Sequence, residues 1–249
     1  MTGALSPQDL AAALSAHAGG YLRNPVRERR VTCQVCATPV DGFDICYPCR
    51  EHRLQAGRFL ADAVGFCTYA IDGRQSGHLM YGYKSRLSGP THRSIVSLLV
   101  GLALTQHTSC VAKLRTCPVT HWTTVPSLNG RPGEHPLHQS AAVFPQGTEV
   151  PVEAATTQNP RGLSATHFRI GQQLPPSSHV LVVDDTWVSG GHMQSLVLAL
   201  REAGAAQVSA LAIARWLKPD RDPTREFVRT RLTPDFQPLA CPWTSHACP

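Results

Sequence analysis

The chain has 249 residues, enough for one sizeable domain with a small addition or for two modest domains. Its 42% hydrophobic residues can supply a core, and together with only 16% charged residues they exclude wholesale disorder. The net charge of +6 comes almost entirely from arginine, because Lys84, Lys113 and Lys218 are the only lysines. This charge suits an anionic ligand without requiring nucleic acid.

Neither a membrane span nor a signal peptide is expected. The longest apolar stretch, residues 94–105, is too short to cross a bilayer. Residues 1–20 lack the basic start and the continuous apolar run of a signal peptide. We therefore expect a cytoplasmic protein with no membrane partner. Its nine cysteines argue against a disulfide framework and for metal binding by some of them, with the rest as buried thiols.

Strands and helices are expected to alternate along most of the chain. A first helix starts after Ser6 and ends near Gly19. The later elements are helices at 51–63, 91–114 and 192–203, a helix-like segment after residue 136, and strands at 64–71, 120–125, 150–155, 180–183 and 208–214. This order predicts an α/β fold with a doubly wound parallel sheet.

Four cysteines form two C-x-x-C pairs within one short segment: Cys33, Cys36, Cys46 and Cys49. Each pair can present two thiolates to one metal, and together they complete the tetrahedral site of a structural zinc ion. Two redox disulfides, four free thiols and an iron–sulfur cluster are the alternatives. The remaining cysteines show no such pairing and are not expected to be ligands: Cys67, Cys110, Cys117, Cys241 and Cys248.

The surroundings of the cysteines argue against strong nucleic-acid binding. Residues 23–58 hold seven arginines and four acidic residues, a surplus of +3. A zinc ion with four thiolates contributes about −2, which leaves about +1. Nucleic acid is therefore expected to bind only weakly and to dissociate as salt rises.

The stretch 179–194 carries the strongest chemical signal. An apolar strand leads to Asp184 and Asp185, and ligands of open α/β sheets bind at the carboxyl ends of strands. Small residues and the start of a helix follow, where backbone N–H groups can hold an anion. The pattern suits a phosphorylated sugar. Ser189 and the loop amides would hold the phosphate, and the two carboxylates would accept hydrogen bonds from the ribose hydroxyls.

Other phosphate-binding folds are disfavoured. No G-x-x-x-x-G-K-[ST] motif occurs, and no G-x-G-x-x-G follows a strand. Too little chain follows residue 185 for the five βα units of a receiver domain. An ordinary βα turn with an acidic cap is the remaining alternative.

The segment Val180–His192 resembles the signature of type I phosphoribosyltransferases: four apolar residues, two acids, three residues, a hydroxyl residue and a glycine. The four cysteines, the segment 83–86 (Tyr-Lys-Ser-Arg) and the strand end Thr124-Val125-Pro126 make the chain similar to the ComF family of amidophosphoribosyltransferase-like proteins. The resemblance spans roughly residues 30–216. It implies a sheet of the type I phosphoribosyltransferase kind with a small N-terminal zinc module.

The resemblance implies phosphoribosyl pyrophosphate (PRPP) as ligand, bound with Mg²⁺. Asp184 and Asp185 would bind its ribose hydroxyls. The pyrophosphate would lie on the loop 127–131, where Arg131 is also a sensible contact by its own chemistry. The residues implied for the pyrophosphate are Ser127, Asn129, Gly130 and Arg131, and those implied for the 5′-phosphate are Val188, Ser189, Gly190, Gly191 and His192.

The chain departs from that family at two places. His192 stands where the family usually has threonine, and residues 131–135 read Arg-Pro-Gly-Glu-His in place of the usual Arg-Gly-Phe-Asn. Two functions remain open: a phosphoribosyltransferase of the glycosyltransferase class acting on a small acceptor, and a non-catalytic PRPP- or nucleotide-binding accessory protein linked to DNA uptake. No catalytic base is identifiable.

The expected organisation has four parts. Residues 1–30 form a helical extension, 31–58 the zinc module, 59–218 the phosphoribosyltransferase-like domain and 219–249 a C-terminal tail. Neither the acceptor substrate nor the oligomeric state follows from the sequence.

Overall fold

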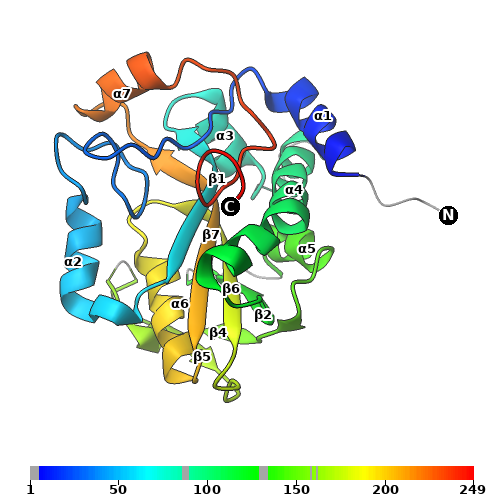
Figure 1. The fold of residues 1–249 in the computed structure, drawn as a ribbon, viewed down its shortest axis with the longest axis vertical. Helices are drawn as coiled ribbons and strands as arrows, with labels where there is room; N and C mark the ends of the chain where they lie inside the picture. Colours follow the sequence, from blue (N-terminus) through cyan, green and yellow to red (C-terminus); the bar gives the residue numbers. More distant parts are fainter. Residues whose placement is uncertain (1–5, 86–89, 129–133, 158, 161) are drawn as a thin grey trace.

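The computed structural model describes residues 6–85, 90–128, 134–157, 159–160 and 162–249. Its centre is a five-stranded sheet in the order β1-β7-β6-β2-β3, in which every neighbouring pair is parallel (Figure 1). This confirms the expected mixed α/β fold with a parallel central sheet. The strands are β1 (Ala63–Ile71), β2 (His121–Thr124), β3 (Thr148–Glu149), β6 (His179–Trp187) and β7 (Gln207–Leu217).

The central strands are apolar on both faces because both faces are covered. In β6, Leu181 and Val183 point into one core, and Val180 and Val182 point into another. All four side chains are fully buried. The continuous apolar run therefore locates the strand, although β6 continues through the two acidic residues to Trp187.

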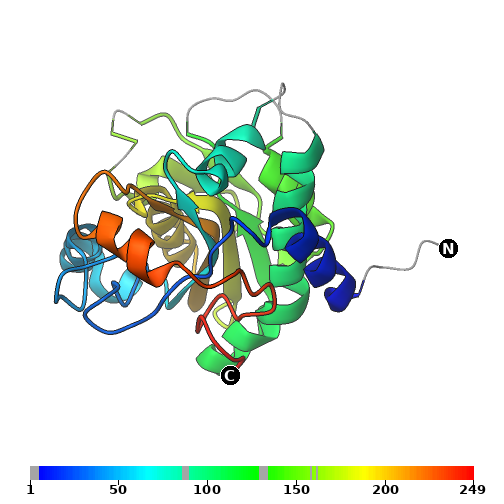
Figure 2. The same ribbon diagram turned by 90° about the horizontal axis from the view of Figure 1, so that it is seen from above.

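Helices α1 (Pro7–Ala18), α3 (Gln75–Gly82) and α4 (Pro90–Arg115) lie on one side of the sheet. Figure 2 shows α4 between the sheet and α1. A capping box starts α1, in which Ser6 Oγ accepts from the Asp9 backbone N–H at 3.2 Å and Asp9 Oδ2 accepts from the Ser6 backbone N–H at 3.0 Å. Buried Leu10 and Leu14 then join the core beneath α1.

Helix α4 matches the helix predicted at 91–114 to within one residue at each end, and it is longer than the apolar stretch 94–105 that was judged too short to cross a bilayer. It has 26 residues and an 18-residue window of mean hydropathy 1.6, so by length and composition it could span a membrane, alone among the helices of the described residues. However, 61% of that window is buried inside the protein. Its packing between α1 and the sheet accounts for its apolar side chains as those of a core helix.

Helix α6 (Gly191–Glu202) and the cysteine segment, residues 33–59, cover the opposite face. The cysteine segment ends in α2 (Tyr47–Ala56) and a short 3₁₀ turn, Gly57–Phe59. In Figure 1, α2 and α6 lie on the side of the sheet away from α4. Different segments of the chain therefore cover the two faces of the sheet. Residues from α3 on one side and from the start of α6 on the other meet near the loop after β6.

The strand expected at 150–155 is divided. β3 ends at Glu149, and β4 (Val152–Ala154) pairs instead with β5 (Phe168–Ile170) in a separate antiparallel sheet. Pro151 lies between the two strands and has no N–H to donate, so the ladder of the main sheet stops there. The 3₁₀ turn Ala165–His167 leads into β5.

Two further helices complete the fold. α5 (Pro136–Ala142) is the expected helix-like segment, whereas α3 and α7 (Thr224–Arg231) were not predicted. The C-terminal segment, residues 232–249, follows α7 and contributes buried Phe236, Cys241 and Trp243 to the same core as α1 and α4. The boundaries expected at residues 30, 58 and 218 stay predictions.

Candidate functional site

The acidic pair lies in the last part of β6, between β2 and β7. β6 extends to Trp187, so Asp184 and Asp185 belong to the strand rather than to the loop after it. Neighbouring residues of a strand point to opposite faces of the sheet. The two carboxylates therefore have different surroundings although they are adjacent in the chain.

Asp185 is buried among three donor side chains from two segments of the chain. Its Oδ2 accepts a hydrogen bond from the Tyr83 hydroxyl and lies 2.6 Å from Lys84 Nζ and 3.5 Å from His135 Nε2. His135 Nδ1 accepts from the backbone N–H of Leu137 at 3.2 Å, so the proton of a neutral His135 ring lies on Nε2, facing Asp185. Burial by itself would raise the pKa of Asp185, but the charge and hydrogen bond of Lys84 hold it below its ordinary value.

Asp184 is only partly buried and has the opposite character. Its Oδ1 accepts the backbone N–H of Asp185 at 2.8 Å. Burial, and then the negative charge of Asp185, raise the pKa of Asp184 to about 8. Near neutral pH, Asp184 is therefore the carboxyl group of the pair that holds a proton and can exchange it.

The loop after β6 leads directly into α6. Gly190 has φ +90°, and a Cβ on it would lie 2.2 Å from Cζ2 of Trp187, so only glycine fits. Val188 and Ser189 are exposed, and no side chain caps the N-terminus of α6. The uncapped first turn of a helix is suited to an anion.

Two adjoining cavities bring the predicted groups together. The first, of about 380 Å³, is lined by both aspartates together with Ser127 and Lys84. The second, of about 420 Å³, is lined by residues 186–193. Both cavities share five residues: Asp184, Thr186, Val188, His192 and Lys218.

The predicted pyrophosphate loop is only partly described. Ser127 lines the first cavity. Asn129, Gly130 and Arg131 lie outside the described residues. His135, which follows this loop, reaches both the first cavity and Asp185.

Sequence reasoning missed the cations of this site. Lys84 and Lys218 are two of the three lysines in the chain, and both line the first cavity. Lys218 directly follows β7, the strand beside β6, so its place at a carboxyl strand end was a usable signal. Lys84 offered no comparable signal, because its pairing with Asp185 joins two distant segments.

Arg215 was also missed, and it connects the loop to the cysteine segment. This buried arginine of β7 donates from Nη1 to the carbonyl oxygens of Trp187 and Val188, each at 2.9 Å. Its Nε donates to the carbonyl oxygen of Cys36 at 2.8 Å. One side chain thus fixes both the start of the predicted phosphate loop and one C-x-x-C turn.

The four N-terminal cysteines converge as predicted. The Sγ atoms of Cys33, Cys36, Cys46 and Cys49 all lie within 4.8 Å of one another, and Cys36 and Cys46 are 3.6 Å apart. Two thiolates on a tetrahedral ion with bonds of ~2.3 Å are about 3.8 Å apart. The group can therefore hold one metal ion.

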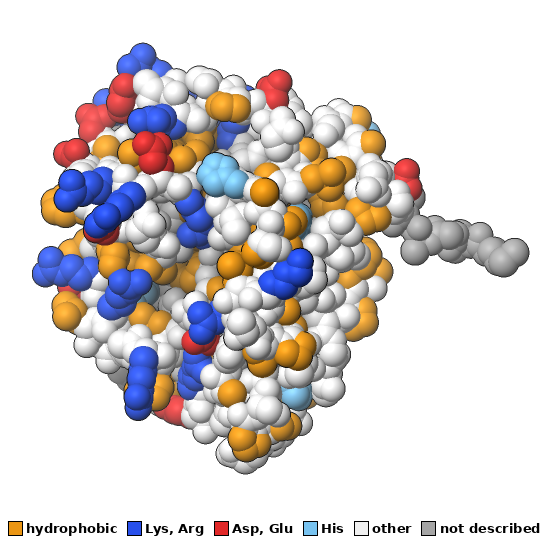
Figure 3. All heavy atoms as spheres, in the orientation of Figure 1, with side chains coloured by type: hydrophobic (Ala, Val, Ile, Leu, Met, Phe, Trp, Pro, Cys, Tyr) orange, Lys and Arg blue, Asp and Glu red, His pale blue; other side chains and the backbone are white. Residues whose placement is uncertain are grey.

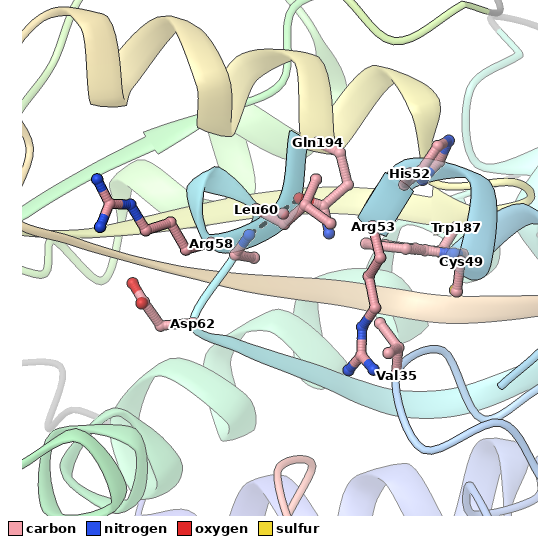
Figure 4. Close-up of a pocket in the computed structure, with 11 residues that line it drawn as sticks. Val35, Cys49, His52, Arg53, Arg58, Leu60, Asp62, Trp187 and Gln194 are labelled. Atoms are coloured by element: carbon pink, nitrogen blue, oxygen red, sulfur yellow. Dashed lines mark hydrogen bonds between the residues drawn. The ribbon is translucent and has the colours of Figure 1, made fainter. Parts of the chain in front are cut away.

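A third cavity, of about 300 Å³, lies between the cysteine segment and α6 (Figure 4). Arg53, Arg58 and Asp62 line this cavity, and Gln194 lines it from α6. The Oε1 atom of Gln194 accepts a hydrogen bond from the Ala61 backbone N–H at 3.0 Å. Asp62 is already paired with Arg201 at 2.5 Å. No residue predicted to bind ribose or phosphate lines this cavity.

Arginine side chains gather on the side of the molecule that carries α2 and α7 (Figure 3). Several are paired with acids, as Arg29 is with Asp44 at 3.1 Å and Arg229 is with Glu226 at 2.7 Å. Interleaved charges of both signs weaken the field that a nucleic acid would meet. The expectation of weak nucleic-acid binding stays a prediction.

No family model matches the chain, and no curated protein matches it. Among solved structures, the crystal structure of a purine phosphoribosyltransferase from Pyrococcus horikoshii Ot3 is similar to part of it at 12% sequence identity. That match covers 48% of this chain and 87% of the other, with a TM-score of 0.31. Likeness at this level assigns neither ligand nor activity, so the roles of the site residues depend on their own geometry.

Proposed function

We propose that the chain binds PRPP with Mg²⁺ at the carboxyl end of β6 and transfers its phosphoribosyl group to a small acceptor. The observation that carries this proposal is the pair of adjoining cavities that share Asp184, His192 and Lys218. One cavity offers carboxylates for ribose hydroxyls, and the other offers a glycine-containing helix start for a phosphate. The five residues that line both cavities place the two chemistries side by side, as one sugar phosphate requires.

The two aspartates are proposed to act differently. Asp184 faces the cavity with fewer partners and contacts the ribose hydroxyls directly. Asp185 makes all three of its side-chain contacts named above through Oδ2, so its larger role is to hold Lys84 and His135 at the edge of the cavity. Lys84 and Lys218 then provide positive charge for the phosphate groups.

The proposed reaction is displacement at C1 of the ribose. Positive charge develops on the ring and negative charge on the departing pyrophosphate, so fixed cations near the pyrophosphate lower the barrier. A bound 5′-phosphate would orient C1 towards the acceptor. The carboxylate of Asp184 and the Ser127 hydroxyl are oxygen donors of the kind that Mg²⁺ accepts, and the ion would neutralise pyrophosphate charge.

Zinc is the metal proposed for the four N-terminal cysteines. Arg215 is buried and Arg27 is partly buried beside them, and in the described part of the chain neither has a carboxylate within 4.0 Å. Buried cations need an opposite charge. A zinc ion with four thiolates carries about −2 and supplies it.

A non-catalytic PRPP- or nucleotide-binding protein is the second candidate. The engagement of Asp185 by Lys84 and Tyr83 favours it, because an active site that uses both acids on ribose would have to break these contacts. Incubation with PRPP, Mg²⁺ and a panel of bases and amines separates the two candidates. Release of pyrophosphate only with an acceptor establishes the transferase, and binding without release establishes the second.

Calorimetry with PRPP and Mg²⁺ tests the ligand itself. Above pH 8, where Asp184 is ionised, Asp184→Asn should weaken binding about tenfold or more, because a charge-assisted hydrogen bond contributes roughly 1.5–3 kcal/mol. Asp235→Asn is the matched control, since Asp235 is an exposed acid that lines neither cavity. The proposal fails if the wild type gives no heat of binding, or if Asp184→Asn binds as tightly as the control.

A further inference from the structure

The C-terminal segment meets α4 at a second group of metal-binding side chains, none of which was expected to be a ligand. It consists of His107 and Cys110 from α4 and of Cys241 and Cys248 from the C-terminal segment. Their ligand atoms all lie within 4.8 Å of one another. Cys110, Cys241 and Cys248 show no pairing in the sequence and were not expected to be ligands, but the return of the C-terminal segment to α4 brings them together.

We infer that these four residues form a second zinc site that fastens the C-terminal segment to α4. The donor set is one imidazole and three thiols, which is the Cys₃His set of closed structural zinc sites. His107 and Cys110 are three residues apart in one helix, so they share a helix face. The other two ligands arrive together from one short loop.

The spacing of the atoms suits one tetrahedral ion. Nδ1 of His107 lies 3.7 Å from Sγ of Cys110 and 3.5 Å from Sγ of Cys248. Bonds of ~2.3 Å to sulfur and ~2.0–2.1 Å to nitrogen place such a pair about 3.6 Å apart. Thiols are weak hydrogen-bond partners, so a metal ion satisfies this nitrogen far better than the sulfurs alone do.

Burial also favours a structural ion. His107 and Cys110 are each 3% exposed and Cys241 is 1% exposed, whereas Cys248 is exposed. Three ligands are thus fixed inside the protein, and the fourth closes the site from the solvent side. A disulfide between two of these cysteines would leave the third thiol and the imidazole at the same point without a use.

The surrounding contacts hold the C-terminal loop in place. Trp243 Nε1 donates to the carbonyl oxygen of His107 at 2.9 Å, which ties the loop to the helix residue that supplies the nitrogen ligand. Within the loop, the Cys241 N–H bonds to the carbonyl of His246 at 3.0 Å and the Thr244 hydroxyl bonds to that of Ala247 at 2.8 Å. These turns bring Cys248 back towards Cys241.

β1 is shaped to receive the same loop. A Cβ on Gly65 would lie 2.8 Å from Cε3 of Trp243, so the indole packs where only a glycine leaves room. The Phe66 N–H donates to the carbonyl of Pro242 at 3.0 Å. The proposed ion therefore fastens a segment that already contacts both α4 and β1.

Elemental analysis of the full-length protein tests the inference. The wild type should contain two zinc ions per chain, Cys248→Ser should contain one, and Cys36→Ser should also contain one. Cys117→Ser is the matched control and should keep both, because Cys117 belongs to neither group. Cys248→Ser is chosen because its exposed position leaves the fold intact, which circular dichroism verifies.

Cobalt substitution identifies the ligands independently of the count. Cys36→Ser, which keeps only the proposed site, should show the cobalt spectrum of three sulfurs and one nitrogen, and His107→Ala in the same background should abolish it. Limited proteolysis should release the C-terminal segment faster from Cys248→Ser than from Cys117→Ser. Equal zinc content in wild type and Cys248→Ser, iron or copper in place of zinc, or a disulfide among these cysteines would overturn the inference.

Discussion

The acidic end of β6 and the N-terminal cysteine segment both bring together side chains that can carry negative charge, but they differ in how far these side chains are open to solvent. The cysteines face one another and are almost closed to solvent, with Cys33 and Cys36 at most 1% exposed. Asp184, Ser189 and His192 line cavities instead. Polar groups that find their partners inside the protein stabilise the fold, whereas polar groups that face a cavity are available to a ligand.

Arg215 connects the two regions, so variants that alter one region alone are needed to separate their roles. Lys84 is paired with a buried acid whereas Lys218 is exposed, so their substitutions test ligand binding at the end of β6 with and without a loss of stability. The pKa of Asp184 tests the surroundings of the acidic pair in the absence of ligand.

Replacing Arg215 should have the largest effect, because it breaks both regions at once. Arg215→Met removes the hydrogen bonds to Trp187, Val188 and Cys36 and leaves buried carbonyl oxygens unpaired. We expect the free energy of unfolding to fall by about 3 kcal/mol or more. Denaturant titration measures it, with Arg229→Met, an exposed arginine, as the control. Equal stability of the two variants would show that the regions are independent.

Replacing the lysines should separate binding from stability. Lys218→Met should weaken PRPP binding about tenfold, equivalent to ~1.4 kcal/mol, with an unchanged melting temperature because the side chain is exposed. Lys84→Met should weaken binding and also lower the melting temperature, because it leaves the buried carboxylate of Asp185 without its cation. Calorimetry and thermal unfolding of both variants decide this. Equal melting temperatures for the two would contradict the assigned role of Asp185.

The last prediction concerns pH. The pKa of Asp184 is raised from 3.8 to about 8, so between these values the folded protein holds a proton that the unfolded chain releases. This group therefore lowers stability progressively as pH rises from about 4 to about 8. Asp184→Asn should flatten the decline in melting temperature between pH 5 and pH 8. Parallel curves for wild type and variant would show that the pKa of Asp184 is not raised in the folded protein.

Local patterns predicted much of this molecule. The strands β1, β6 and β7, the helices α1, α4 and α6 and the convergence of Cys33, Cys36, Cys46 and Cys49 all follow from residue spacing. Such features depend on neighbours within one or two turns, so composition and periodicity are sufficient to locate them. The division at Pro151 was missed because a run of β-forming residues does not show which strand it will join.

The candidate site could be predicted only in outline. The acidic pair and the glycines after it were visible as a strand end followed by a helix start. The pairing of Lys84 with Asp185 was not visible, because Lys84, just after α3, and Asp185 in β6 are about 100 residues apart and meet only in the folded chain. The same holds for Arg215, which reads in the sequence as one basic residue in an apolar strand.

The sequence by itself determined the alternating elements, the C-x-x-C pairs and the chemistry at the end of β6, because covalent spacing fixes which residues share a turn or a strand face. The tertiary structure decided which acid is paired, which lysines reach the cavity and that His107 meets Cys110, Cys241 and Cys248. These contacts join distant segments. They arise from the order of strands in the sheet and from the return of the C-terminal segment across β1 to α4, and no local pattern encodes either.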